Sequence, residues 1–323
     1  MSAGEKSGPG PAQRQLGILE LDRFSQESLT RWKQLSEDLD ELQACLFFGL
    51  RPEQRRLRSE LISALQTQTP VDLPLQNWVR NVSYRFSPDY RFSLDPLSAA
   101  GSLLMFGGRF NPGVDLDADT LSPFPALYVA EDAETASREK FQLPSTGSVD
   151  GLRPQELALA QTGSFSTVII NGHMRNVFDM TSPKSLDPIA KILGRIKMPE
   201  RARRLRTKLE IGRGSLFMMT TGRQLYSAML EQNWRGLPAQ FGLPAPSHTI
   251  AELIREAAFD AILYRSTKGS GRCLAIFPDR LSAGSYVELA DAPPAAVKTT
   301  KLDVTTGEML AGWGVLPKRD LPR

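Results

Sequence analysis

The sequence carries the heptapeptide Gly-Gly-Arg-Phe-Asn-Pro-Gly at residues 107–113. Two glycines before Arg109 predict a tight turn, because glycine adopts backbone conformations that other residues avoid. The arginine fork matches phosphate oxygens with two parallel hydrogen bonds. The stretch therefore favours two interpretations: a turn where an anion approaches the backbone closely, or a simple hairpin turn with a surface arginine.

Two further residues follow this turn in an informative order. Tyr128 ends the apolar run that begins at Ala126, and Glu139 follows in a predicted helix. A tyrosine ring can stack on a planar base, and a carboxylate can stabilise positive charge that develops on a ribose. Taken singly, Tyr128 also fits a core or rim position. Glu139 also fits an exposed helical position beside a basic residue, where an ion pair contributes little.

Ser266 comes directly after a predicted strand at residues 261–264. A serine in such a place is usually a turn residue, and no histidine is close enough in sequence to activate it as a nucleophile. No single motif decides the function. The order of all four motifs along the chain carries the signal.

The composition is that of an ordinary globular protein, with 41% hydrophobic and 23% charged residues in a chain of 323. A net charge of +3 argues neither for nucleic acid nor for a membrane. No apolar run reaches about 18 residues, so no membrane partner is expected. Cys45 and Cys273 favour a reducing, cytoplasmic location. With only two histidines, no zinc spacing can be built, and neither a metal nor a bound cofactor is expected.

The apolar periodicity divides the chain into four predicted parts. Residues 1–16 are polar and predict a disordered tail that lacks the apolar segment of a signal peptide. Residues 17–75 predict a helical N-terminal extension, residues 76–295 the main domain, and residues 296–323 a C-terminal tail. The extension has its own apolar stripe, so it is expected to pack on the main domain or to mediate homo-oligomerisation.

Within the extension, the sequence predicts two amphipathic helices, at residues 22–50 and 52–66. The break is placed at Arg51-Pro52, because proline disfavours a helical residue before it. Residues 70–74 begin and end with proline and predict a linker.

Many short strands with few helices predict an α+β fold for the main domain. The predicted helices are 132–141, capped by Asp132, and 251–258. A turn is predicted at Gly172, between two strands. The predicted strands are 82–86, 126–130, 166–170, 176–180, 261–264 and 273–277.

The most basic stretch of the chain spans residues 191–213. It is interpreted as a solvated helical face. Nucleic-acid binding is the sharper alternative, but the stretch lacks interleaved aromatic residues that would stack on bases, so nucleic acid is not expected as a partner.

Taken together, these segments resemble the RES-domain family, which is named for arginine, glutamate and serine. The family carries a Gly-Gly-Arg-aromatic-Asn-Pro-Gly turn, an apolar strand with a tyrosine, and a glutamate one helix later. Here these correspond to residues 107–113, Tyr128 and Glu139. A strand with an aspartate at residues 176–181 and the serine segment 263–266 match in the same order. An acidic stretch before Tyr128, a long basic segment and Cys273 in place of a usual asparagine depart from the family.

The resemblance implies an ADP-ribosyltransferase-like RES domain preceded by a helical extension, acting on NAD+ as substrate. Family members are toxins that cleave NAD+ by hydrolysis or phosphorolysis, or that transfer ADP-ribose to a protein. A partner antitoxin often blocks their pocket. The alternatives for this chain are a protein mono-ADP-ribosyltransferase and a non-catalytic module that only binds NAD+ or a partner.

The resemblance also implies roles for individual residues. Arg109 would hold the pyrophosphate, Tyr128 would stack near nicotinamide or ribose, and Ser266 would hydrogen-bond the ribose or the carboxamide. Glu139 would stabilise the ribosyl cation, as in glycoside cleavage. The implied catalytic set is Arg109, Tyr128, Glu139 and Ser266, and the implied NAD+-binding set is Gly108, Arg109, Asn111, Tyr128 and Ser266.

Overall fold

The computed structural model describes residues 25–83, 95–117, 119–143, 165–293 and 297–316. The chain divides into two compact units. The first comprises Met1–Pro52 and Met198–Phe217, and the second comprises Glu53–Lys197 and Met218–Arg323. The predicted tail at residues 1–16 and the end of the predicted strand at 82–86 lie outside the described residues.

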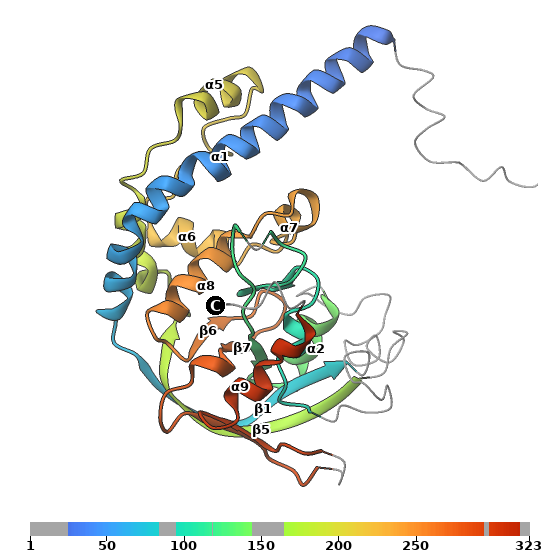
Figure 1. Ribbon diagram of the computed structural model, residues 1–323, viewed down its shortest axis with the longest axis vertical. Helices are drawn as coiled ribbons and strands as arrows, with labels where there is room; N and C mark the ends of the chain where they lie inside the picture. Colours follow the sequence, from blue (N-terminus) through green and yellow to red (C-terminus); the bar gives the residue numbers. More distant parts are fainter. Residues whose placement is uncertain (1–24, 84–94, 118, 144–164, 294–296, 317–323) are drawn as a thin grey trace, which may run out of the picture. The chain divides into compact units, whose positions relative to one another are not determined.

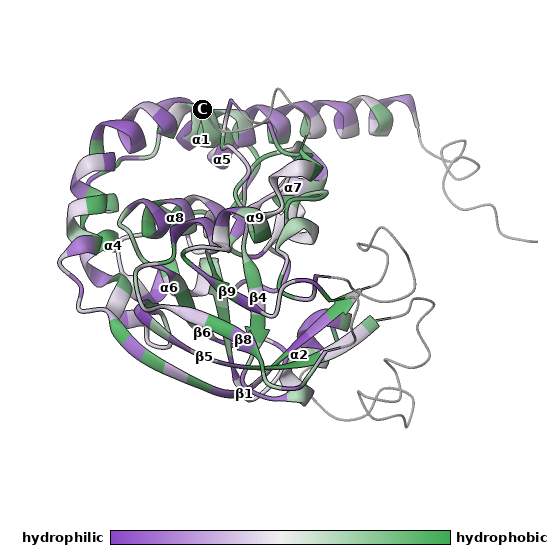
Figure 2. Cartoon of the chain, turned by 60° about the horizontal axis from the view of Figure 1, so that its bottom comes forward, coloured by the Kyte–Doolittle hydropathy of each residue, from purple (hydrophilic) through white to green (hydrophobic). Residues whose placement is uncertain are grey.

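Helix α1 (Gln26–Gln66) runs through both units without interruption, so the predicted break at Arg51-Pro52 is wrong. A proline inside a helix costs about 3 kcal/mol, and burial of a leucine contributes about 1.5–3 kcal/mol, so the leucines buried on both sides offset it. Hydrophilic and hydrophobic residues alternate in short bands along α1 (Figure 2). The buried leucines are Leu42 in the first unit and Leu57, Leu61 and Leu65 in the second.

The boundary between the units falls after Pro52, not after residue 75 as the sequence predicted. The second half of α1 belongs to the second unit, where Arg58 pairs with Glu252 and Glu256 of α8 (Pro246–Glu256). Strand β1 begins at Val71, inside the stretch predicted as a linker.

In the first unit, α5 (Glu200–Lys208) supplies the partner for the first half of α1. Ala202 and Leu205 form a buried cluster with Leu42. The basic stretch is thus helical where α5 lies, with an apolar side that the sequence did not reveal.

The second unit is built on a seven-stranded sheet in the order β1-β4-β7-β6-β5-β8-β9. Figure 1 labels four of these strands, β1, β5, β6 and β7. Strand β1 also pairs with β5, so β1, β4, β7, β6 and β5 form a closed ring of strands. Among the described residues, the strand pairings of this sheet are antiparallel except that of β5 with β6, which is parallel. The strands are β1 (Val71–Ser83), β4 (Leu127–Ala130), β5 (Phe165–Asp179), β6 (Ala261–Arg265), β7 (Arg272–Ile276), β8 (Tyr286–Leu289) and β9 (Lys301–Asp303).

Strand β5 corrects one prediction of the sequence. It runs continuously through Gly172, where a turn was predicted, and Gly172 pairs with Val287 of β8. Glycine inside a strand can mark the close approach of another backbone instead of a turn. The predicted pair of strands around Gly269–Gly271 is confirmed by the antiparallel pairing of β6 with β7.

The C-terminal segment is a second correction, because the described part of residues 296–323 belongs to the fold. Strand β9 pairs with β8, and helix α9 (Gly307–Ala311) follows it. Leu302 and Leu310 lie in the same buried cluster as Leu127, Leu263 and Leu274. A short sequence of mixed composition has no periodicity that would reveal such long-range pairing, which is why the sequence predicts a tail here.

Helices complete the mixed α+β architecture. α2 packs against β1 and β4, and α8 packs against β6. No helix in the described ranges combines the length and apolar character that crossing a bilayer would require. The remaining α-helices of the second unit are α2 (Ala133–Phe141), α4 (Asp187–Leu193), α6 (Gly222–Met229) and α7 (Gly236–Phe241), with short 3-10 helices at Ala100–Ser102, Pro183–Leu186, Pro278–Arg280 and Trp313–Val315.

Candidate functional site

The glycine–arginine turn is a small hairpin formed by β2 (Gly107–Gly108) and β3 (Asn111–Pro112). Gly107 has a φ of +84°, the conformation that the sequence predicted for a glycine in this turn. The turn therefore directs Arg109 from a fixed backbone, with Arg109 and Phe110 as its two central residues.

Tyr128 of β4 packs on this turn. Its hydroxyl accepts a hydrogen bond of 2.8 Å from the Phe110 N–H and donates one of 2.9 Å to Asn111 Oδ1. A Cβ on Gly108 would lie 2.5 Å from the Tyr128 hydroxyl oxygen, so only glycine allows this approach. Burial raises the pKa of the Tyr128 hydroxyl well above its usual range, which keeps it protonated as a donor. The hydroxyl holds the turn, and stacking of the half-buried ring on a ligand stays a prediction.

Asn111 is fully buried, and its amide supports the turn. Its Nδ2 donates to the carbonyls of Ser102 at 2.7 Å and Phe124 at 3.0 Å. Its Oδ1 accepts from the Gly108 N–H at 3.1 Å. This geometry favours a supporting role over the direct NAD+ contact that the resemblance implies, and that contact stays a prediction.

Helix α2 begins as the sequence predicted, with Asp132 as its N-cap. The Asp132 carboxylate accepts a hydrogen bond of 2.7 Å from the Thr135 N–H. The Thr135 hydroxyl in turn accepts one of 3.2 Å from the Gly271 N–H. Just before α2, Glu131 binds Arg272 through side-chain hydrogen bonds of 3.0 and 2.6 Å. The loop between β6 and β7 is thereby fastened along α2.

Glu139 lies near the end of α2 and meets the same loop. Its Oε1 accepts hydrogen bonds from the Ser266 hydroxyl at 2.6 Å and from the Thr267 N–H at 3.1 Å. Ser266 Oγ accepts two more, from the N–H groups of Lys268 at 3.0 Å and Gly269 at 2.8 Å. The Ser266 hydroxyl proton therefore points at the carboxylate, and Ser266 fixes the position of Glu139.

The second oxygen of Glu139 has a different environment. In the part of the chain that the structure describes, no hydrogen bond ends on Glu139 Oε2. The carboxylate is thus oriented through one oxygen, and its other oxygen can accept hydrogen bonds from a ligand hydroxyl.

Arg109 is buried at 6% exposure and reaches the same loop. Its Nη2 donates to the Thr267 hydroxyl at 3.1 Å. Its Nη1 donates to the carbonyls of Glu231 at 2.7 Å and Met229 at 3.3 Å. Arg109 takes part in none of the ion pairs found among the described residues, where its hydrogen-bond partners are carbonyl and hydroxyl oxygens.

Thr267 connects the two charged residues. Its N–H binds Glu139 and its hydroxyl binds Arg109. Sequence reasoning did not select Thr267, although it directly follows Ser266. The structure thus brings together Arg109, Glu139 and Ser266 around one loop, with Tyr128 beneath the turn that carries Arg109.

His248 is a second residue that the sequence did not reveal. It is fully buried, and its Nε2 lies 2.8 Å from the Gly108 carbonyl oxygen, which can only accept. Its Nδ1 accepts a hydrogen bond of 3.4 Å from the Ala245 N–H. These partners require the neutral ring with the proton on Nε2, and burial lowers the pKa of His248 to about 4. Gly108 and His248 are separated by 140 positions in the sequence, so no local signal reveals this contact.

Trp234 lies next to His248 in this site, and Arg235 lies next to Trp234. The Trp234 ring packs edge-on against His248 with a centroid distance of 5.4 Å. The Arg235 guanidinium lies 4.3 Å from the Trp234 ring centroid. These residues follow the segment whose carbonyls bind Arg109, so they belong to the same structural neighbourhood.

Other chemistry at this site is limited by the groups present. Burial, followed by the Glu139 charge, raises the pKa of the Cys273 thiol well above its usual range, which disfavours the thiolate form that a nucleophile needs. Within the described ranges, no group of three or more His, Cys, Asp or Glu side chains could hold a metal ion.

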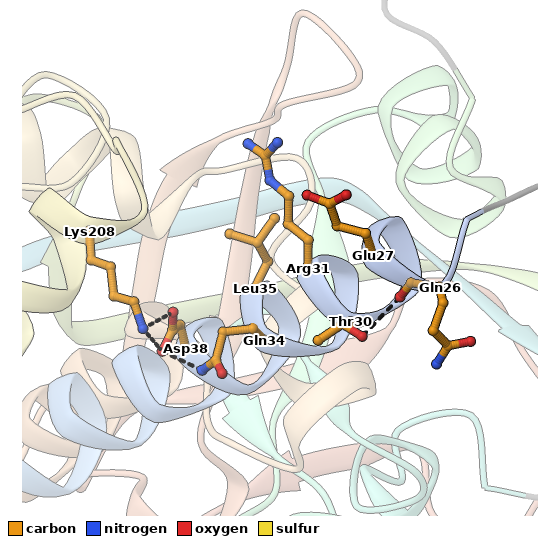
Figure 3. Close-up of a pocket in the computed structure, with 8 residues that line it drawn as sticks. All are labelled: Gln26, Glu27, Thr30, Arg31, Gln34, Leu35, Asp38 and Lys208. Atoms are coloured by element: carbon orange, nitrogen blue, oxygen red, sulfur yellow. Dashed lines mark hydrogen bonds and ion pairs between the residues drawn. The ribbon is translucent and has the colours of Figure 1, made fainter.

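A surface cavity of about 550 Å³ lies elsewhere, on the first unit. It is lined by residues of α1 and by Lys208, which pairs with Asp38 (Figure 3). None of the site residues predicted from the sequence lines it.

Comparison with known proteins adds little to this geometry. No family model matches the chain. No curated protein matches it either. The structure is similar to a chain in the crystal structure of the M. tuberculosis MbcT–MbcA toxin–antitoxin complex, with 13% identity and a TM-score of 0.38 over 78% of this chain and 96% of that one. A likeness of this size carries no argument about function.

Proposed function

We propose that this chain is an NAD+-consuming enzyme that cleaves the bond between nicotinamide and ribose. The observation that supports this most directly is the placement of Glu139, with Oε1 held by Ser266 and Thr267 and Oε2 left for a ligand. A fixed carboxylate of this kind stabilises the positive charge that develops on the ribose as the bond breaks.

Cleavage of this bond requires few catalytic groups besides the carboxylate. The electron pair of the C1–N bond leaves on the nicotinamide nitrogen, whose positive charge it neutralises, so no general acid is needed. The oxygen of the acceptor then bonds to C1 and loses its proton to solvent. Glu139 accepts hydrogen bonds from the ribose hydroxyls, and the buried Arg109 charge makes the site attractive to the anionic phosphates.

The resemblance to the RES-domain family supports two further parts of the proposal. The enzyme acts as a toxin, and a partner antitoxin protein covers this site. The acceptor is water, phosphate or a protein side chain. An ADP-ribosyl acceptor on a protein would make the chain a mono-ADP-ribosyltransferase, and the product identifies which of these reactions occurs.

The test is incubation of the purified protein with NAD+, with and without phosphate, followed by mass spectrometry of the products. Release of nicotinamide with ADP-ribose indicates hydrolysis, ADP-ribose 1″-phosphate indicates phosphorolysis, and labelled protein indicates transfer. Intact NAD+ after long incubation with folded protein would contradict the proposal. If NAD+ still binds, the chain is a non-catalytic module.

A further inference from the structure

Arg235 holds an exposed guanidinium beside the proposed site. It lies 4.3 Å from the centroid of the Trp234 ring, and Trp234 is only 5% exposed. Trp234 is itself packed edge-on against the buried His248. The guanidinium therefore rests on a rigid surface, and little conformational entropy remains to be lost when it binds a ligand.

The Arg235 side chain reaches the end of α2, the helix that carries Glu139. Its Nη1 donates to Gln142 Oε1 at 3.4 Å, and Gln142 in turn donates to the Glu139 carbonyl at 2.6 Å. The hydrogen bond at 3.4 Å is long and its acceptor is neutral, so a charged acceptor can replace it at low cost.

Arg109 holds the segment that leads to Arg235. It donates to the carbonyls of Met229 and Glu231 and, from its other nitrogen, to Thr267. At 6% exposure, the Arg109 guanidinium is largely committed to this role. Of the two arginines, Arg235 is the one with a face open to a ligand.

The charges at this place are unbalanced. The pKa of Arg235 is lowered from its usual value, first by partial loss of solvation and then by the nearby charge of Arg109, as expected for two like charges that repel. Neither arginine belongs to an ion pair among the described residues, and Glu139 is the nearby carboxylate that acts on Arg235. An anion placed at Arg235 would relieve this repulsion.

We propose that Arg235 is the residue that contacts the pyrophosphate of the bound dinucleotide, and that Arg109 acts as a positioning residue for the segment that carries it. The identity of the ligand rests on the function proposed above. The planar fork of Arg235 suits paired contacts to phosphate oxygens, which a lysine ammonium makes only as a point charge. Two parts of the ligand are thus bound by different residues: Arg235 contacts the pyrophosphate, and the Glu139 carboxylate contacts the ribose.

The experiment uses the full chain and inorganic pyrophosphate as the probe, titrated by calorimetry. Arg235→Gln is compared with wild type and with Arg280→Gln, a matched loss of an exposed arginine in the 3-10 helix Pro278–Arg280. We expect the Kd for pyrophosphate to rise about 10- to 100-fold in Arg235→Gln, the loss typical of a hydrogen bond to a charged group. Arg280→Gln should bind as wild type does, and Arg235→Lys should show an intermediate loss.

Turnover of NAD+ by the same proteins separates this inference from the proposed function. The rise in KM should exceed the fall in kcat for Arg235→Gln. Pyrophosphate binding that depends on Arg235 without any NAD+ turnover would overturn the proposed function and leave the anion site standing. NAD+ turnover with equal pyrophosphate binding in wild type and Arg235→Gln would overturn the inference and leave the function standing. Absence of pyrophosphate binding by wild type would also overturn the inference.

A double-mutant cycle tests the role of Arg109. If Arg109 acts through Arg235, then Arg109→Lys weakens pyrophosphate binding in the wild-type background and weakens it much less in the Arg235→Gln background. Equal losses in both backgrounds would show that Arg109 contacts the anion independently.

Discussion

At the scale of single residues, Glu139 carries the proposed chemistry, and its neighbours make one substitution especially informative. In Glu139→Gln the amide oxygen can still accept from Ser266 and Thr267, so the loop stays in place. The negative charge opposite the ribosyl cation is lost. We expect an unchanged melting temperature and a fall in kcat of about 10²–10³, the usual cost of one such electrostatic contact. NAD+ turnover at the wild-type rate by the folded variant would remove Glu139 from the mechanism.

Gly108 allows the close contact between the turn and Tyr128. Gly108→Ala would place a Cβ 2.5 Å from the Tyr128 hydroxyl oxygen, so the ring or the turn must move. We expect a loss of about 1–3 kcal/mol in the free energy of unfolding, as for other overpacked sites. Gly314→Ala is the matched control, because a Cβ there meets nothing within 4 Å. Urea unfolding of both variants measures the difference, and equal stabilities would show that the turn adapts freely.

His248 makes stability depend on pH in a defined window. Its pKa is lowered by burial to about 4 in the fold, against an ordinary value of 6.5. Below pH 6.5 the unfolded chain therefore binds a proton at His248 that the native chain does not bind. The contribution of neutral His248 to the free energy of unfolding is complete above pH 6.5 and is lost as the pH falls towards 4. The slope is at most about 1.4 kcal/mol per pH unit.

The comparison variant is His248→Gln, whose amide can donate to the Gly108 carbonyl but does not titrate. Between pH 7 and pH 5, we expect the wild type to lose about 2 kcal/mol more unfolding free energy than the variant does. Urea unfolding at each pH measures this difference. Parallel pH profiles would mean that His248 is readily protonated inside the fold.

At the scale of elements, the sequence predicted what depends on local patterns. The cap of α2 at Asp132 follows from an aspartate before a helical run, and the pairing of β6 with β7 follows from two apolar runs around glycines. Contacts between distant segments were not predictable in this way. Thr267, His248 and Arg235 each meet a partner far along the chain, and nothing in their local sequence marks them. The predicted helix break at Pro52 and the predicted turn at Gly172 are wrong, because packing of α1 and pairing of β5 outweigh the local preferences of proline and glycine.

Helix α1 offers a prediction about how the two units share it. Leu65 is fully buried in the second unit, and Leu42 is buried in the first. Leu65→Ala should lower the stability of the second unit by about 2–5 kcal/mol, the range for leucine truncations in cores. Leu42→Ala should leave the second unit unchanged. Hydrogen exchange of the β6 and β7 amides reports on the second unit alone, and equal loss of protection in both variants would show that the helix couples the units.

At the scale of the whole molecule, the first unit remains the part without an assigned role. Trp32, Leu35 and Leu39 recur at helical spacing on α1 with exposures of 73%, 42% and 41%. The expectation that the extension packs on the main domain or mediates homo-oligomerisation stays a prediction. Oligomerisation through α1 would bury this stripe.

The basic stretch at residues 191–213 raises the question of nucleic acid at the same scale. Carboxylates of this chain already partner much of its charge. Arg201 binds Glu41 with hydrogen bonds of 2.6 and 2.8 Å, and Lys208 binds Asp38, with 2.7 Å between the charged atoms. Arg203 and Arg204 both pair with Glu200. A phosphate would have to compete with these internal carboxylates.

We therefore expect weak, salt-sensitive binding to nucleic acid and no dedicated site. The measurement is a titration with labelled DNA and RNA at about 50 and about 200 mM salt, where a true polyanion site loses affinity with a log–log slope of about −0.9 for each phosphate neutralised on B-DNA. The variant changes Arg201, Arg203, Arg204 and Arg206 to Gln. Tight binding at the higher salt that this variant abolishes would contradict the prediction, because only phosphates outcompeting Glu41 and Glu200 could produce it. Weak binding that vanishes at the higher salt is what any basic helix shows, and it would leave α5 as a solvated face.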